Sequence, residues 1–121
     1  MSTDFGSTTT RKARKTHQCE ECLRDIQPGE RYERHAGVWE GTFFTFVSCP
    51  HCAALRTTIS DIDTEFWEGA FGGVGEWFAH GLWREYIKTF EDGLRFLRLS
   101  RRFGTKWLSS TGELLPVEEA A

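Results

Sequence analysis

The sequence predicts an α+β fold, and three features of the 121-residue chain support that prediction. All four cysteines fall in two Cys-x-x-Cys pairs, Cys19 with Cys22 and Cys49 with Cys52. The stretch between the pairs contains alternating apolar residues after a Gly-flanked loop, which is the pattern of a β-hairpin. After residue 76, apolar residues recur at steps of three and four, which indicates helix.

The spacing of the four cysteines is typical of a zinc site. Zn²⁺ binds four thiolates tetrahedrally at about 2.3 Å, and a Cys-x-x-Cys turn directs both of its sulfur atoms at one ion. Because four cysteines leave no open position for water, the ion is expected to be structural and not catalytic. We therefore predict one Zn²⁺ bound by Cys19, Cys22, Cys49 and Cys52.

Two other interpretations of the cysteines stay open at this point. The sequence Cys49-Pro50-His51-Cys52 also occurs in strongly oxidising thiol–disulfide oxidoreductases, but the preceding residues do not supply the thioredoxin-like frame that such proteins need. A pair of disulfides would require an oxidising compartment. Because the residues after Met1 are polar and lack the apolar stretch of a secretory signal, we expect the cytoplasm, where thiols remain free for metal.

Residues 1–16 are expected to form a disordered basic arm. They are rich in Ser and Thr and lack apolar periodicity. Their basic residues are concentrated between Arg11 and Lys15. Such a composition does not bury enough apolar surface to offset the entropy lost on ordering the chain.

Residues 17–60 are expected to form a treble-clef zinc module. The first cysteine pair makes a knuckle, and two strands follow over residues 30–36 and 42–48. Pro50 suits the first turn of a helix, where its missing N–H leaves no hydrogen bond unmade, and the helix continues to about Ser60. A knuckle, a hairpin and a helix whose first turn supplies two ligands, in this order, make the treble-clef arrangement.

Residues 61–121 are expected to form a helical extension with a short C-terminal β-hairpin packed on it. One helix should run from Glu76 to about Arg102, with Gly81 and Gly93 as the candidate break points. The hairpin is expected from residues 106–109 and 113–117. The apolar stripe that should face the core consists of Trp83, Ile87, Phe90, Leu94 and Leu97, and Leu99 and Phe103 widen it near its end.

The cysteine-containing half of the chain resembles a group of small, largely uncharacterised treble-clef proteins of actinobacterial bacteriophages and prophages. The shared motifs are Cys19-x-x-Cys22, Ile26-x-x-Gly29-Glu30-x-Tyr32, Trp39-Glu40-Gly41-x-Phe43 and Cys49-x-x-Cys52. The ending Trp107 … Gly112-Glu113-Leu114-Leu115-Pro116-Val117 is similar to theirs as well. The resemblance implies a phage origin and a zinc site, and it implies no activity.

We expect a non-enzymatic protein that binds a host or phage protein. Ten Phe and five Trp are a heavy aromatic load for this length, and aromatic rings concentrate at interfaces. Trp39 lies in a turn, where a role in the core is hard to arrange, so the predicted partner surface includes it. The alternative is that Trp39 folds back onto Phe43 or onto the C-terminal helices. No catalytic residues are predicted, because the helix after Cys52 lacks the His or Asn that treble-clef nucleases need, and no small-molecule substrate is expected.

The alternative is a nucleic-acid-binding zinc-finger protein. The basic arm and a helix face with Arg95, Arg98 and Arg102 would then contact phosphates, which position a protein without reading sequence. The net charge of −3 and the acidic pair Glu20-Glu21 argue against this function. A membrane partner is not expected, because no apolar run approaches the roughly 20 residues needed to cross a bilayer.

Overall fold

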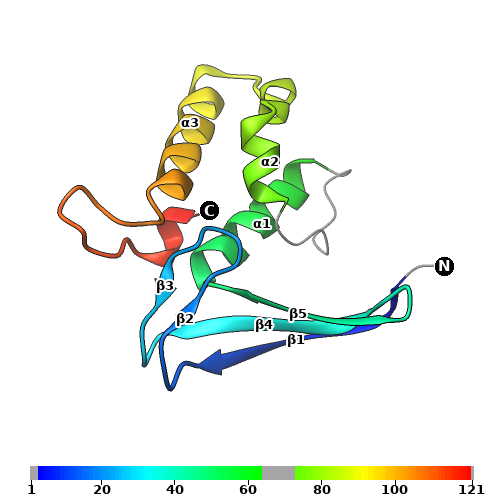
Figure 1. The fold of residues 1–121 in the computed structure, drawn as a ribbon. Helices are drawn as coiled ribbons and strands as arrows, with labels where there is room; N and C mark the ends of the chain where they lie inside the picture. Colours follow the sequence, from blue (N-terminus) through cyan, green and yellow to red (C-terminus); the bar gives the residue numbers. More distant parts are fainter. Residues whose placement is uncertain (1–2, 64–72, 121) are drawn as a thin grey trace.

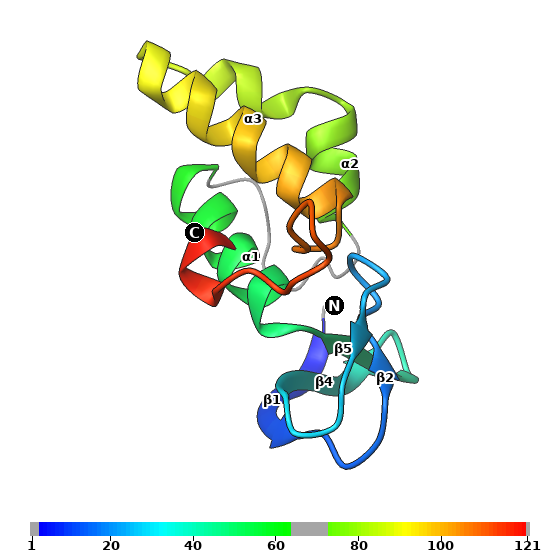
Figure 2. The ribbon, with the colours of Figure 1, turned by 90° about the vertical axis from the view of Figure 1, so that its left-hand side faces the viewer.

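The computed structural model describes residues 3–63 and 73–120 and has a mixed α+β architecture (Figure 1). Its strands are β1 (Thr3–Lys12), β2 (His17–Gln18), β3 (Asp25–Ile26), β4 (Arg31–Trp39) and β5 (Thr42–Ser48). Its helices are α1 (Pro50–Ile62), α2 (Val74–Ala79) and α3 (Phe90–Gly104), with 3₁₀ turns η1 (Leu82–Tyr86) and η2 (Val117–Ala120). The strands form one end of the molecule and α2 and α3 the other, with α1 between them (Figures 1 and 2).

The larger sheet contains three antiparallel strands in the order β1-β4-β5, and β2 pairs with β3 in a separate two-stranded sheet. The predicted hairpin is confirmed, but β4 extends to Trp39, which pairs with Thr42. The loop therefore contains only Glu40 and Gly41, at φ 50° and 81°. Two left-handed residues are what the tightest hairpin turn requires, because their twist matches that of the strands.

The prediction of a disordered arm over residues 1–16 is wrong for most of that segment. Strand β1 pairs with β4 from Lys12 opposite Arg31 to Thr3 opposite Trp39. Two physical causes favour the strand. Its threonines suit a pleated surface, and the edge of β4 offers unpaired backbone groups that β1 satisfies.

The long helix predicted after residue 76 is divided into three pieces. Gly81, one of the two candidate break points, adopts φ 66° between α2 and η1. The second break falls before Thr89, whose hydroxyl caps α3 by accepting a hydrogen bond from the Asp92 N–H at 3.0 Å. Gly93, the other candidate, lies inside α3.

The predicted apolar stripe is wrong for α3. Trp83 is buried, but the exposed fractions are 80% for Phe90, 49% for Leu94 and 52% for Leu97, and Ile87 is exposed as well. The breaks at residues 81 and 88–89 change the helical phase, so Trp83 and Ile87 do not continue the line of Phe90, Leu94 and Leu97, which share the exposed side of α3. The core takes the other apolar side of α3, which carries Phe96, Leu99 and Phe103.

The C-terminal segment contains less β-structure than predicted. The expected hairpin is reduced to a single antiparallel bridge between Leu108 and Leu114. The chain then forms η2, which packs against α1 and α3, and Arg102 of α3 forms an ion pair with Glu119. Because Pro116 has no N–H to donate, a longer ladder is not available there.

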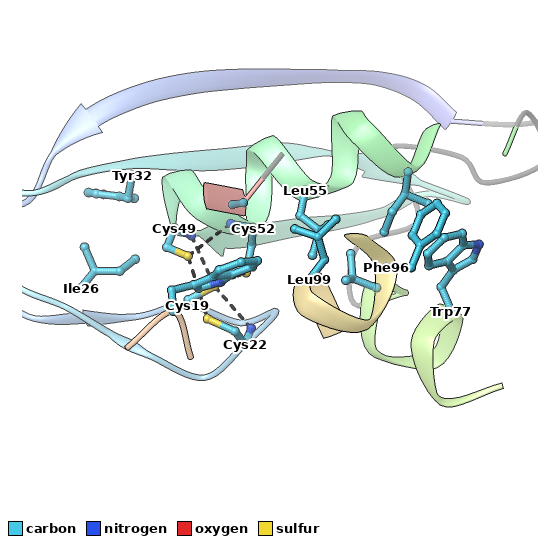
Figure 3. Packing of buried hydrophobic residues seen from close by; sticks show 14 of the residues in the cluster. Cys19, Cys22, Ile26, Tyr32, Cys49, Cys52, Leu55, Trp77, Phe96 and Leu99 are labelled. Atoms are coloured by element: carbon cyan, nitrogen blue, oxygen red, sulfur yellow. Dashed lines mark hydrogen bonds between the residues drawn. The ribbon is translucent and has the colours of Figure 1, made fainter. Parts of the chain in front are cut away.

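One hydrophobic core joins the cysteine-containing half to the helical extension. Leu55 of α1 and Leu99 of α3 are fully buried and lie between the four cysteines and the pair Trp77 and Phe96 (Figure 3). The Trp77 and Phe96 rings pack edge to face with their centroids 5.8 Å apart. The two predicted segments, 17–60 and 61–121, therefore share a core. Among the described helices, none has the length and apolar character needed to cross a membrane.

Candidate metal centre

The four predicted ligands lie together at the boundary between the sheets and the helices. The sulfur atoms of Cys19, Cys22, Cys49 and Cys52 all lie within 4.8 Å of one another, and all four residues are buried. The Cys22 and Cys49 sulfur atoms are 3.9 Å apart. A tetrahedral ion with bonds near 2.3 Å separates its sulfur ligands by about 3.8 Å. The four thiols can therefore hold one metal ion.

The knuckle that carries the first two cysteines is a tight turn between β2 and β3. The backbone N–H of Cys19 donates to the carbonyl of Arg24 at 2.8 Å, and Leu23 N–H donates back to the Cys19 carbonyl at 2.9 Å. Leu23 has φ 68°, a left-handed conformation that lets the turn close. Arg24 forms a buried ion pair with Glu30 at 3.2 Å, which supports the turn from outside.

The second pair occupies the N-terminus of α1, as predicted. Cys49 is the N-cap residue, and its sulfur accepts a hydrogen bond from the Cys52 N–H at 3.4 Å. Pro50 occupies the first helical position. The positive end of the helix dipole favours negative charge at this point, so both sulfur atoms are placed where a thiolate is stabilised.

Additional N–H donors point at the sulfur atoms. The Cys19 sulfur accepts from the N–H groups of Cys49 at 3.3 Å and Cys22 at 3.5 Å. The Cys52 sulfur accepts from the indole Nε1–H of Trp107 at 3.4 Å. Hydrogen bonds to the charged form favour that form. Together with the Cys52 N–H that donates to Cys49, three of the four sulfur atoms thus accept an N–H hydrogen bond.

The close approach of the four thiols shifts their pKa values in opposite directions. A hydrogen bond with Cys22 lowers the pKa of Cys19 to about 7, and one with Cys19 lowers the pKa of Cys49 below the usual range. Hydrogen bonds with Cys19 raise the pKa values of both Cys22 and Cys52. Cys19 and Cys49 therefore lose their protons more readily than Cys22 and Cys52, and a cation bound among the sulfur atoms would favour the thiolate form of all four.

The donor set favours zinc and excludes the disulfide interpretation for this conformation. A disulfide needs a sulfur–sulfur distance of about 2.0 Å, and all four cysteines are free thiols. Soft thiolate ligands in a closed tetrahedral arrangement suit Zn²⁺. Because every ligand is buried, the geometry offers no wide opening for a substrate.

A buried ion pair ties the knuckle to the helices. Arg56 of α1, 4% exposed, pairs with the carboxylate of Glu21, which lies between the first two cysteines. The other oxygen of Glu21 accepts from the N–H of Val74, at the start of α2, at 3.3 Å. The adjacent Glu20 carboxylate accepts from the Val47 N–H of β5 at 2.7 Å. Both acids thus have structural partners.

Two residues cover the second cysteine pair: His51, which lies within that pair, and Trp107, which sequence reasoning did not assign to the site. Trp107 is fully buried, and its ring stacks on that of His51 with centroids 5.7 Å apart. The Nε2 atom of His51 lies 2.5 Å from the Leu115 carbonyl oxygen, which holds the C-terminal segment over the site. In the sequence, Trp107 stands out only as the first residue of the ending that resembles the phage-type group, and it lies beyond the end of α3, in a left-handed conformation with φ 62°.

His35, which has no visible catalytic partner in the sequence, is a buried link between strands. Its Nδ1 lies 2.9 Å from the Thr8 hydroxyl of β1, and its Nε2 lies 3.2 Å from the Ser48 hydroxyl of β5. Burial, together with the charge of Arg56, lowers the pKa of His35 to about 4. The imidazole is therefore neutral at pH 7 and joins all three strands of the larger sheet.

The residues predicted to bind a partner do not form one surface. The backbone of Trp39 ends β4, and its side chain lies outside the described part of the structure. The β4–β5 turn and α3 lie at opposite ends of the molecule (Figure 1). On α3, Arg98 is exposed and Arg95 is half-buried, whereas Arg102 pairs with Glu119. A search for similar proteins among family models, curated proteins and solved structures finds no match for this chain.

Proposed function

We propose that this chain is a non-enzymatic, zinc-stabilised treble-clef protein that binds another protein through the outer side of α3. One Zn²⁺ on Cys19, Cys22, Cys49 and Cys52 would be structural. The closed set of four buried thiols supports this role, because a catalytic zinc keeps a position open for water or substrate. The order of knuckle, hairpin and helix supports the treble-clef assignment.

The observation that carries the binding function is the exposed apolar surface of α3. Phe90, Leu94 and Leu97 are between 49% and 80% exposed, although each is a large apolar residue. Isolated exposed apolar residues are common, but a contiguous group on one helix face marks an interaction site. We call these three residues the outer apolar face of α3.

The resemblance described above adds a class of partner. The resemblance implies a phage origin, so we propose a host or phage protein as the partner. No catalytic group is required for such a role, and the His35 imidazole is engaged in the sheet.

Affinity capture with matched variants tests this function. The expected result is that zinc-loaded wild-type protein retains specific partners, whereas Leu94→Glu loses them. Phe43→Glu is the matched control, because Phe43 is 63% exposed but belongs to β5, far from α3. Equal capture by Leu94→Glu and wild type, with zinc retained in both, would exclude the outer apolar face as the binding site.

A second candidate function, nucleic-acid binding, is supported by a basic cleft beside the zinc module. The cleft is lined by Arg11, Lys12, Ala13, Arg14, Lys15, His17 and Tyr32. Its four Lys and Arg side chains are exposed, and the described residues give none of them a carboxylate partner. The acidic pair Glu20-Glu21 argued against this function, but Glu21 is buried and its charge is neutralised by Arg56.

Salt dependence separates the two functions. Binding to phosphates weakens steeply as salt rises, whereas an apolar interface does not. If the second candidate holds, a fluorescent oligonucleotide binds at low salt, and Arg14→Glu with Lys15→Glu lowers its affinity at least tenfold. Absence of binding at low salt would remove this candidate.

A further inference from the structure

The outer apolar face of α3 lies on the side of the helix away from the core. Phe96, Leu99 and Phe103 form the buried side. At 100° per residue, the centre of the Phe90, Leu94 and Leu97 face lies roughly 150° away from that buried side. Within the described part of the chain, about half or more of each of these three side chains is exposed, so the face is accessible to a partner that approaches along the helix.

The spacing of the face is that of a helix–helix seam. Phe90, Leu94 and Leu97 follow one another at steps of four and three, the repeat that places apolar residues along the contact line of paired helices. The Ile87 side chain borders the face on its Gly93 flank, because a Cβ at Gly93 would lie 3.8 Å from its Cδ1 atom. The geometry favours a second helix as the occupant.

The charges beside the face specify the direction of that second helix. Glu91 and Arg98 lie two turns apart on the same flank, and neither has an ion-pair partner among the described residues. The first turn of α3 is acidic, with Glu91 and Asp92, and the last turn is basic, with Arg101 and Arg102. A helix with the same charge order is complementary to α3 only when it runs antiparallel.

We propose that the occupant is a second copy of this chain, with the two α3 helices packed antiparallel about a two-fold axis. Leu94 of each copy then faces Leu97 of the other, and Glu91 of each copy faces Arg98 of the other. A two-fold interface is self-complementary, so each favourable contact occurs twice. The opposite flank carries Gly93, against which the Ile87 side chain lies, and Ser100.

The proposal rests on the proposed function, because it names the partner of the same face. The contact is short: 15 residues of α3 extend about 22 Å. One helix pair of this length lies near the lower limit of about 1,000 Å² for a specific interface. A dissociation constant in the micromolar range is therefore expected.

Sedimentation equilibrium of the full zinc-loaded chain tests the proposal at concentrations from about 5 to 500 μM. The mass should rise from that of one chain to that of two. Leu94→Glu should remain at the mass of one chain throughout and keep its zinc, whereas Phe43→Glu should dimerise like wild type. Wild-type protein that stays at one chain's mass at the highest concentration overturns the proposal, as does a Leu94→Glu variant that dimerises normally.

A charge exchange tests the antiparallel geometry. Glu91→Arg alone and Arg98→Glu alone should each weaken dimerisation roughly 3- to 30-fold, because two attractive pairs become repulsive. The double variant should recover most of the wild-type affinity. A double variant weaker than either single variant would exclude the Glu91–Arg98 pairing.

Capture experiments distinguish this proposal from the proposed function. If wild type is monomeric at every concentration but Leu94→Glu loses a captured host or phage protein, the dimer is excluded and the proposed function stands. If wild type dimerises through α3 and no other protein depends on that face, the second copy is the partner.

Discussion

Trp107 donates its indole N–H to the Cys52 sulfur at 3.4 Å, although the two residues are 55 positions apart. The contact places the segment that follows α3 over the candidate metal centre, where the Trp107 ring also stacks on His51. The helical extension is therefore part of the environment of the four thiols. A substitution in the helical extension should therefore alter the stability of the candidate metal centre, and loss of the metal should destabilise the helical extension.

Trp107→Phe keeps an aromatic ring but removes the donor to the Cys52 sulfur. We expect a loss of about 1–2 kcal/mol in the free energy of unfolding, because a buried hydrogen-bond acceptor loses its partner. Zinc release to a chromogenic chelator should also become faster. Trp83→Phe is the control, since that ring is buried away from the sulfur atoms and packs on Phe96. Equal release rates in the two variants would show that the indole donor does not support the site.

Arg56→Met leaves the buried carboxylate of Glu21 without its cation. Removing one member of a buried ion pair costs about 3–5 kcal/mol, because the remaining charge is desolvated and unpaired. The double variant Glu21→Gln with Arg56→Met should be more stable than Arg56→Met alone. Urea unfolding of the variants measures the difference, and a double variant that is the less stable of the two would contradict this account.

His35 should make stability depend on pH. Its pKa falls from about 6.5 in the unfolded chain to about 4 in the folded sheet. Between these values the unfolded chain binds more protons, so stability decreases as the pH falls from about 6.5 to 4, by about 2–3 kcal/mol in all. Metal release in acid adds to this loss. His35→Gln does not titrate, so the slope of unfolding free energy against pH should be smaller for that variant than for wild type, and equal slopes would refute the assignment.

The two sides of α3 should respond differently to truncation. Phe96 is 3% exposed and contacts Trp77 and Trp83, so Phe96→Ala should cost about 3–5 kcal/mol. Phe90 is 80% exposed, and Phe90→Ala should change the stability of dilute protein by less than about 0.5 kcal/mol. Thermal unfolding followed by circular dichroism measures both. A larger loss of stability for Phe90→Ala than for Phe96→Ala would show that the buried side of α3 is the one that carries Phe90, as the sequence pattern predicts.

Local signals in the sequence predicted the metal centre and the elements that carry it. The Cys-x-x-Cys spacing encodes two tight turns, Pro50 marks the start of α1, and the alternation of β5 is visible within a few residues. Each of these features depends on chemistry within one turn or one strand. That is why the four cysteines could be predicted to lie together without a structure.

The features that sequence reasoning did not predict depend on long-range packing. Strand β1 is polar, and only its pairing with the edge of β4 accounts for its order. Helix α3 has two apolar sides, and contacts with Trp77 and Leu55 decide which side is buried. The Trp107 donor reaches Cys52 only after the chain has folded back along α3.

The zinc content of natively purified protein tests the central claim most directly. We predict one Zn²⁺ per chain by native mass spectrometry, with all four cysteines reactive as free thiols only after the metal is removed. Chelation should unfold at least the region from Cys19 to Ile62, because metal binding supplies part of the folding free energy. Well under one zinc per chain, together with two intact disulfides, would contradict the account.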